Sequence, residues 1–401
     1  MTRRHAAAGL DWLAFFTAAV QTGFGAFVAI FLAEQGWSQA QIGAALTVQT
    51  LAFMATQVPA GALVDAAARV RLLLGGAIGL LAAGALLLAL APVPLTGFLA
   101  LILVAAAGSV LYPGLIALTR AIAGPRGFGE RVGRNARWSA IGSGVGAAAM
   151  GLIASLFSER AVLILTALLC LPAIAALAFT RPRTARPRRR PPHPHAHLAD
   201  HPREPSGAVL PLLRDRRRLV FIACAVLFNL ASAALLAVAS PEVSRRAGNT
   251  AGLLVAAYII VPQIVVAALA PFAGRVAEAI GRRPVLLLGF ATLPLRAASF
   301  ALVGHPYGLV PVQVLEGAAS AAYGVLVPLI AADLTRGTGR TSLALGLIGL
   351  AGALGAALST GLAGWIAEAF GTHAAFLTLT GFGVLAVLVV AVAMPETRAR
   401  P

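Results

Sequence analysis

The sequence contains no lysine, and charged residues make up only 11% of its 401 positions. A soluble domain carries about 25% charged residues, so this composition excludes an ordinary soluble globule. Two cysteines are too few for a disulfide scaffold, and 59% apolar residues exclude a disordered chain. The absence of a Gly-x-x-x-x-Gly-Lys phosphate-binding loop speaks against nucleotide hydrolysis, and we expect neither an enzyme nor a cofactor.

Long apolar runs dominate what is present. A helix of about 20 apolar residues can cross a membrane. Runs of this length begin near residues 10, 41, 71, 96, 138, 161, 217, 251, 284, 309, 342 and 373. The sequence therefore predicts an all-α integral membrane protein with twelve transmembrane helices, embedded in a lipid bilayer.

The arginines predict the orientation of these helices. If the N-terminus is cytoplasmic, 27 of the 31 arginines lie in cytoplasmic segments, and only Arg160, Arg245 and Arg246 lie outside. This distribution follows the positive-inside rule and predicts that both termini are cytoplasmic. The Ala-rich, Lys-free composition is typical of a GC-rich bacterial gene, so we expect a multi-pass protein of a bacterial inner (plasma) membrane. The net charge of +17 is explained by topology, and no nucleic-acid partner is expected.

A segment rich in Arg, Pro and His interrupts the pattern at residues 181–216. It separates six predicted helices in residues 1–180 from six in residues 217–401, which predicts two six-helix bundles joined by a cytoplasmic linker. Four histidines lie between His193 and His201. Their spacing suits a divalent metal ion, and an unstructured tether explains them as well, so no metal site is assigned.

The two halves of the sequence repeat one another. Gly61, Asp65 and Arg69 have counterparts 213 positions later, and the counterpart of Arg71 lies 212 positions later. These counterparts are Gly274, Glu278, Arg282 and Arg283. A second echo pairs Leu118-Thr119-Arg120 with Leu334-Thr335-Arg336 at an offset of 216. Two echoes at nearly one offset indicate an internal duplication.

With these motifs the chain resembles the major facilitator superfamily of secondary transporters over essentially its whole length. Pro395-Glu396-Thr397 after the last predicted helix is also similar to that family. The resemblance implies two six-helix bundles that work by alternating access. The repeated loop can be interpreted as a conformational latch, in which a carboxylate meets Arg and the positive N-terminus of a neighbouring helix. The alternative is that these charges only set topology.

The fifth predicted helix carries Gly142, Gly146 and Gly151, in a stretch that partly resembles the antiporter motif of the family's exporters. Ala147 and Met150 depart from that motif, and a packing face of small residues explains the glycines equally well. In the fourth helix, Val104 stands where proton-coupled exporters usually carry Arg.

Two ionisable residues lie deep inside predicted helices, Arg296 in the ninth and Glu316 in the tenth. Each lies seven residues from the turn between these helices, which places both at the same depth of an antiparallel hairpin. A charge at membrane depth is costly, so the two are expected to pair. The pair either locks the hairpin or couples transport to protons.

Polar uncharged residues within the spans are candidates for a substrate cavity. They are Gln21, Gln49, Tyr112, Asn229, Tyr258, Gln263, Gln313 and Tyr323. Four acids near span ends are expected to reach water instead: Asp11, Glu34, Asp333 and Glu368.

These patterns favour a monomeric secondary transporter that exports small amphipathic compounds, with protons as the coupling ion. Metal or metalloid efflux, suggested by the His193–His201 cluster, and uptake of an organic anion through Arg296 remain alternatives. A receptor or lipid-handling protein on the same fold would differ from all three by moving no solute.

Overall fold

The computed structural model describes residues 3–125, 127–180, 215–247 and 251–398. Within these ranges all regular structure is helical and no strand occurs. The predicted all-α fold class is confirmed. The histidine cluster at 193–201 and most of the predicted linker lie outside the described residues.

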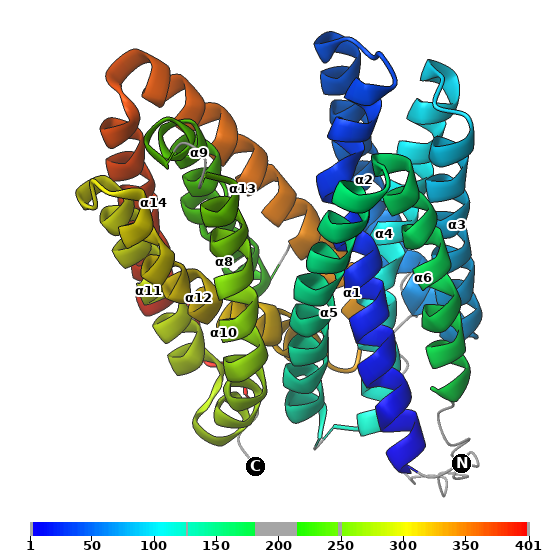
Figure 1. Ribbon diagram of the computed structural model, residues 1–401. Coiled ribbons are helices and arrows are strands. Elements are labelled where there is room, and N and C mark those ends of the chain that lie inside the picture. Colours follow the sequence, from blue (N-terminus) through cyan, green and yellow to red (C-terminus); the bar gives the residue numbers. More distant parts are fainter. Residues whose placement is uncertain (1–2, 126, 181–214, 248–250, 399–401) are drawn as a thin grey trace, which may run out of the picture.

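Two bundles of helices lie side by side (Figure 1). The first contains α1 (Arg3–Glu34), α2 (Gln39–Ala66), α3 (Val70–Leu90), α4 (Pro94–Ala123), α5 (Phe128–Leu156) and α6 (Glu159–Phe179). The second contains α8 (Arg216–Ser232), α9 (Ala234–Ala247), α10 (Ala251–Ile280), α11 (Arg282–Leu302), α12 (Leu309–Leu334), α13 (Thr341–Phe370) and α14 (Thr372–Ala393). A 3-10 turn, Pro306–Gly308, precedes α12.

Among the described residues, eleven helical segments are long and apolar enough to cross a membrane. Residues Arg216–Ala239, which include α8 and the start of α9, count as one such segment. The 28-residue α2 supplies a further long helix at the position of the predicted second span. The helices begin within four residues of the predicted starts, apart from α1 and α5.

The fifth helix begins at Phe128, ten residues before the predicted position, and this expectation was wrong. The added turns carry Arg131, Arg134 and Asn135, which no apolar pattern assigns to a helix. They are helical because they have partners inside the protein: Arg131 and Arg134 pair with Asp11, and Asn135 bonds Thr119. Polar groups that are paired in this way can be buried.

Helix starts are fixed by local chemistry. Ser38 and Gln41 form a capping box at α2, in which each side chain bonds the other's backbone. Ser158 accepts a hydrogen bond from the Ala161 N–H at α6, and Asp215 accepts one from Arg217 at α8. Each cap satisfies backbone donors that the first turn of a helix leaves free.

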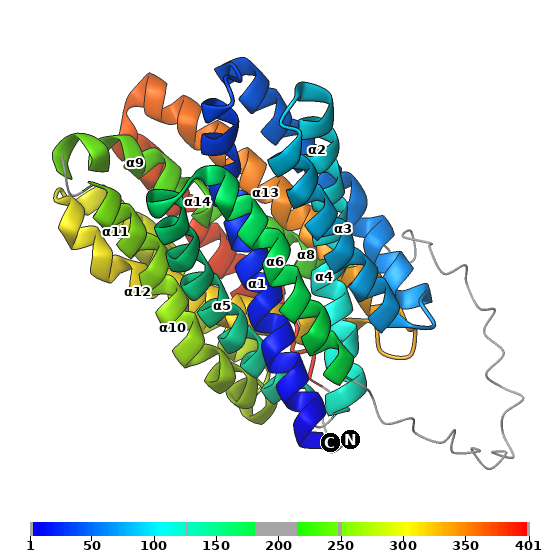
Figure 2. The same ribbon diagram turned by 45° about the vertical axis from the view of Figure 1, so that its right-hand side comes forward.

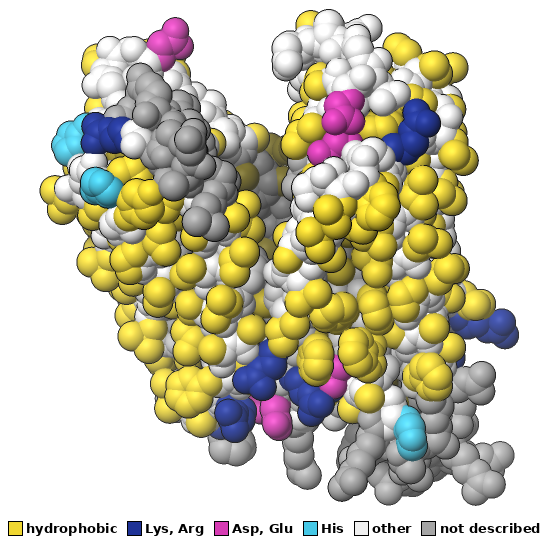
Figure 3. Space-filling view, in the orientation of Figure 1, with side chains coloured by type: hydrophobic (Ala, Val, Ile, Leu, Met, Phe, Trp, Pro, Cys, Tyr) yellow, Lys and Arg dark blue, Asp and Glu magenta, His cyan; other side chains and the backbone are white. Residues whose placement is uncertain are grey.

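The most extensive contacts between the bundles are those of α2 with α13 and of α5 with α10. Both termini lie at the end where the bundles converge, which we call the termini end (Figures 1 and 2). The surface is hollowed between the bundles at the opposite end, and hydrophobic side chains cover the middle of the molecule (Figure 3). One core cluster joins the bundles, since Phe128 and Val132 of α5 pack with Ala273 and Ala277 of α10.

Candidate functional site: contacts at the termini end and charges within the bundles

Asp65, at the end of α2, caps the first turn of α13 in the other bundle. Its two carboxylate oxygens accept hydrogen bonds from the Ser342 N–H at 2.9 Å and the Leu343 N–H at 2.7 Å. The positive end of a helix stabilises a negative charge placed there. Asp65 and Ser342 are 277 positions apart in the sequence, and their contact ties the two bundles together.

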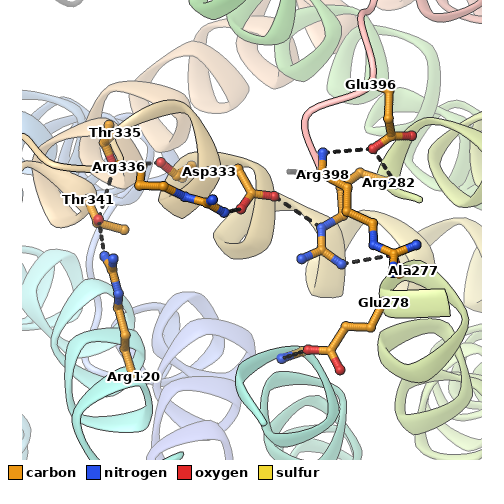
Figure 4. A network of polar contacts seen from close by, with 12 residues as sticks. Arg120, Ala277, Glu278, Arg282, Asp333, Thr335, Arg336, Thr341, Glu396 and Arg398 are labelled. Atoms are coloured by element: carbon orange, nitrogen blue, oxygen red, sulfur yellow. Dashed lines mark hydrogen bonds and ion pairs between the residues drawn. The ribbon is translucent and has the colours of Figure 1, made fainter. Parts of the chain in front are cut away.

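Glu278, near the end of α10, makes the corresponding contact in the opposite direction. Its Oε1 accepts a hydrogen bond from the Gly129 N–H in the first turn of α5 at 2.6 Å (Figure 4). Glu278 follows Asp65 by 213 positions, and Ser342 follows Gly129 by the same 213. The two contacts are thus related by the internal duplication.

Glycines allow the helix backbones to come close enough for these bonds. A Cβ on Gly61 would overlap the Ser342 carbonyl oxygen, and one on Gly274 would overlap the Gly129 carbonyl oxygen. The same relation recurs one turn further into each helix, where a Cβ on Gly133 would strike the Ala270 carbonyl. Gly346, 213 positions later, faces the Gln57 carbonyl in the same way. Small residues at such crossings permit backbone contact between membrane helices.

Arginines add further bonds between the bundles. The Arg120 Nη1 of α4 donates to the Thr341 hydroxyl of α13 at 2.7 Å, and Thr341 lies 3.0 Å from the Thr335 hydroxyl (Figure 4). Arg137 of α5 donates to the Ala267 carbonyl of α10 at 2.7 Å. Thr335, a member of the second echo, thus lies beside the contact between α4 and α13.

The basic residues of the two loop motifs have different partners. The Arg71 guanidinium donates to the carbonyls of Leu177 and Ala178 at the end of α6. Arg282 pairs with Asp333 at 3.1 Å, and Arg283 donates to the Ala391 carbonyl. None of these bonds joins the two bundles, so Arg71, Arg282 and Arg283 organise their own halves.

Glu396 holds the start of α11. Its carboxylate accepts bonds from the Arg282 N–H at 2.9 Å and the Arg283 N–H at 3.1 Å, and Arg398 bonds it from the other side (Figure 4). Burial raises the pKa of this carboxyl, but the donating backbone N–H groups outweigh burial and leave its pKa below the ordinary value. The Pro395-Glu396-Thr397 motif thus supplies an anion to a helix N-terminus.

Arg296 and Glu316 lie together between α11 and α12. The Arg296 Nη1 donates to Glu316 Oε2 at 2.5 Å, and Nη2 donates to the Gln313 Oε1 at 3.1 Å. Ser320 donates to the other Glu316 oxygen at 2.8 Å. The Arg296 side chain is 6% exposed and that of Glu316 21%. The acid is therefore more exposed than the base.

This cluster is incompletely bonded. Among the described residues, Arg296 Nε and Gln313 Nε2 are buried without a hydrogen-bond partner. An unsatisfied buried donor costs about 1–3 kcal/mol. The arrangement is therefore costly in this conformation, and another conformation or a bound solute can satisfy these donors.

The polar residues predicted to line a substrate cavity lie in several places. Gln21 and Gln49 line a cavity of about 240 Å³ in the first bundle, together with Phe53, Val104 and Gly108. Between the bundles, Tyr112 of α4 reaches the Gly324 carbonyl of α12 at 3.5 Å. The walls of the first cavity are mainly apolar, with amides at its rim.

The remaining candidates lie in the second bundle and its interface. Tyr323 stacks on Phe228 with ring centroids 4.0 Å apart, and Asn229, the next residue, donates to the Ala225 carbonyl. Gln263 of α10 faces Gly144 of α5. Tyr258 is buried in a separate cluster and donates to the Pro306 carbonyl at 2.6 Å. Its hydroxyl is thus already used in packing.

The three glycines of α5 that were predicted to pack against a neighbouring helix differ in their surroundings. A Cβ on Gly142 would overlap the Phe15 carbonyl, and one on Gly146 would lie 2.9 Å from the Ala19 Cα, so both pack against α1. Gly151 does not, because nothing lies within 4 Å of a Cβ placed there. The close contacts of this helix thus involve Gly142 and Gly146, and the packing role of Gly151 stays a prediction.

Asp11 and Asp333 were expected in water, and both are buried. Asp11 is 4% exposed and bonds both Arg131 and Arg134 from α1 to α5. The Asp333 side chain is 9% exposed and pairs with Arg282 and Arg336. Glu34 and Glu368 are exposed, as expected. Two arginines three residues apart at the start of the fifth helix were the signal for a buried acid nearby.

No group of three or more potential metal ligands occurs among the described residues. Cys170 and Cys224 are buried and unpaired within α6 and α8. The part of the chain that the structure describes thus offers helix contacts, an intramembrane ion pair and mainly apolar cavities.

Two bundles of membrane-length helices, related by an internal duplication and joined at one end, define a multi-pass membrane protein of the kind that carries solutes. Comparison with known proteins agrees. The family model of the Major Facilitator Superfamily matches residues 10–246 and 221–401, and the chain belongs to this family. It is 34% identical over 399 residues to uncharacterized MFS-type transporters from two strains of Mycobacterium tuberculosis, covering 98% of this chain and 93% of each relative.

Proposed function

We propose that this protein is an alternating-access transporter that exports small amphipathic compounds in exchange for protons. Membership of the family supports secondary transport in general. The observation that carries the finer proposal is the Arg296–Glu316 pair, an ionisable pair at membrane depth whose acid is partly exposed and whose base is buried. Ionisable residues at this depth mark ion and substrate pathways.

The pair can couple a proton to a change of conformation. While Glu316 is ionised, it neutralises Arg296 and accepts a hydrogen bond from Ser320. A proton on Glu316 removes that neutralisation and leaves Arg296 charged in a buried place, which is unfavourable. Protonation therefore favours a rearrangement of α11 against α12, and release of the proton restores the pair.

The alternation itself takes place at the termini end. The contacts of Asp65 and Glu278 hold the bundles together there, while the opposite end is open (Figure 3). We place the termini end in the cytoplasm of a bacterial inner membrane, because most arginines of the sequence belong to that side. In this proposal the two acids act as a latch that must break before the transporter can load from the cytoplasm.

The cavities favour an amphipathic solute over an anion. Gln21 and Gln49 offer amide hydrogen bonds beside the apolar surface of Phe53 and Leu81. Both terminal nitrogens of Arg296 are already bonded to Glu316 and Gln313, so an anion would have to displace these partners. The export direction rests on the partial resemblance of α5 to the antiporter motif.

Inside-out vesicles with an imposed proton gradient test the proposal. Cationic, neutral, anionic and metal solutes are added in turn while the internal pH is followed. We expect cationic or neutral amphipathic solutes to dissipate the proton gradient in vesicles that contain the native protein and not in vesicles that contain Glu316→Gln. Glu368→Gln, a matched loss of an exposed acid at the end of α13, leaves proton release unchanged.

Two results would overturn parts of the proposal. Passage of labelled solute without proton movement would show that the Arg296–Glu316 pair is a structural lock in a facilitator. Gradient release by metal ions alone, lost on deletion of residues 193–201, would favour metal efflux instead.

A further inference from the structure

The two halves of the duplication differ in the charge of one residue, which follows the last helix of each half. In the second bundle, Glu396 follows α14 and bonds the first residues of α11. The position 213 residues earlier, after α6, holds Arg183 within Pro182-Arg183-Thr184. The motif is otherwise the same as Pro395-Glu396-Thr397, so the charge is reversed in the first half.

The ion pair of the second bundle also has no equivalent among the described residues of the first. Arg282 pairs with Asp333 in the second bundle. The counterpart of Arg282 is Arg69, and at the offset of 216 that relates Thr119 to Thr335 the counterpart of Asp333 is the apolar Ala117. Within the described ranges, neither Arg69 nor Arg71 forms an ion pair with a carboxylate. Within the described part of the chain, the start of α3 therefore keeps the basic residues of the motif without a carboxylate partner.

A groove leads away from these arginines. It encloses about 950 Å³ between α3, α4 and α6, on the first bundle, and both Arg69 and Arg71 lie at its edge. Its other walls are almost entirely apolar and include Gly75, Gly76, Ala121 and Ile174. Because α3 has membrane-spanning length, its first residues lie near the membrane surface and the groove continues toward the hydrocarbon.

We propose that this groove binds an anionic phospholipid, whose phosphate takes the place that the Glu396 carboxylate takes in the second bundle. The phosphate group lies at Arg69 and Arg71, which match its charge. Arg71 keeps its bonds from Nε and Nη2 to the carbonyls of Leu177 and Ala178 and offers Nη1 to the phosphate. An acyl chain lies along the glycines of α3. The first bundle thus obtains from the membrane the anion that the second bundle obtains from its own chain.

Counting lipids that remain bound to the purified full-length protein by native mass spectrometry tests this proposal. The probes are dioleoylphosphatidylglycerol and dioleoylphosphatidylcholine, titrated separately. We expect preferential binding of phosphatidylglycerol, weakened by roughly fivefold for each of Arg69→Gln and Arg71→Gln. Arg160→Gln, which removes an exposed arginine at the opposite end of the molecule, leaves binding unchanged.

Two further variants do not depend on the arginines. A Cβ on Gly76 meets nothing within 4 Å, so Gly76→Leu is expected to fold and to fill the groove. Gly79→Leu has equal space on the same helix but lies outside the groove lining, which makes it the control.

The outcomes separate the lipid from a free anion. Equal binding of both lipids, or unchanged phosphatidylglycerol binding in Arg69→Gln/Arg71→Gln, overturns the proposal. Binding of inorganic phosphate that depends on the arginines, with phosphatidylglycerol indifferent to Gly76→Leu, also overturns it in favour of an anion site. None of these readouts requires transport, so they are independent of the proposed function.

Discussion

Asp65 and Glu278 lie 213 positions apart in the sequence, and each accepts hydrogen bonds from the first turn of a helix in the opposite bundle. The duplicated motif thus forms two reciprocal contacts across one interface. A carboxylate at a helix N-terminus contributes about 0.3–1 kcal/mol, and up to about 2 kcal/mol when partly buried. Contacts of this size can shift a conformational equilibrium without fixing it.

We predict that Asp65→Asn opens the termini end. Loss of the charge weakens the cap on α13 and shifts the equilibrium by roughly 1 kcal/mol, or about fivefold. Spin labels at the exposed positions Phe157 and Phe370 would report closure of the opposite end as a shorter distance. Glu130→Gln removes an exposed acid from the first turn of α5 and leaves the distance distribution unchanged. An unchanged distribution in Asp65→Asn would show that its charge only sets topology.

Gly61→Ala is predicted to have a steric effect at the same interface. The added methyl group would overlap the Ser342 carbonyl, so α2 and α13 can no longer close. We expect transport in vesicles to fall by more than about tenfold. Gly43→Ala, on the same helix with nothing within 4 Å of its Cβ, is the control. Equal rates for the two variants would mean that this close approach is dispensable.

Arg296→Gln is predicted to destabilise the protein more than the double variant Arg296→Gln/Glu316→Gln. Breaking a buried pair leaves one charge uncompensated, at a cost of about 3–5 kcal/mol, and partial exposure of Glu316 reduces this cost. Thermal unfolding of both single variants and the double variant in detergent gives the coupling energy. Additive effects would show that the two charges do not depend on each other.

The contribution of Glu396 to stability is predicted to depend on pH. Its pKa in the folded protein lies below the ordinary value of 4.5, so its stabilising effect is present above that pH and is lost as the pH falls through the folded pKa. Glu396→Gln should therefore lower the melting temperature at pH 7, and the difference from the native protein should shrink as the pH falls below 4.5. A difference that stays constant with pH would mean that the charge of Glu396 is unimportant.

The sequence predicts the helices well because lipid-spanning segments must be apolar and about 20 residues long. The structure departs from this prediction at α5, where Arg131 and Arg134 are helical and bonded to Asp11. Composition alone cannot reveal this, because the partner lies 120 positions away from Arg131. A polar segment looks like a loop until its partner is known.

Part of the candidate site could be predicted from the sequence, namely the part that depends on positions along one helical hairpin. Arg296 and Glu316 each lie seven residues from the predicted turn between their two helices. The geometry of a helical hairpin therefore already predicts that they meet. Tyr258 and Gly151 have no such constraint, since the direction in which a side chain points depends on packing between helices far apart in sequence. Tyr258 turned toward Pro306, and Gly151 toward open space.

The two reciprocal contacts at the termini end are unequal. Asp65 accepts two backbone hydrogen bonds at α13, whereas Glu278 accepts one at α5. Arg137 adds a second bond on the α5–α10 side, from its Nε to the Ala267 carbonyl. The bonds along α2 and α13 therefore both end on one carboxylate, whereas those along α5 and α10 are divided between two side chains. We expect that neutralising Asp65 alone frees the first pair of helices, while freeing the second pair takes two changes.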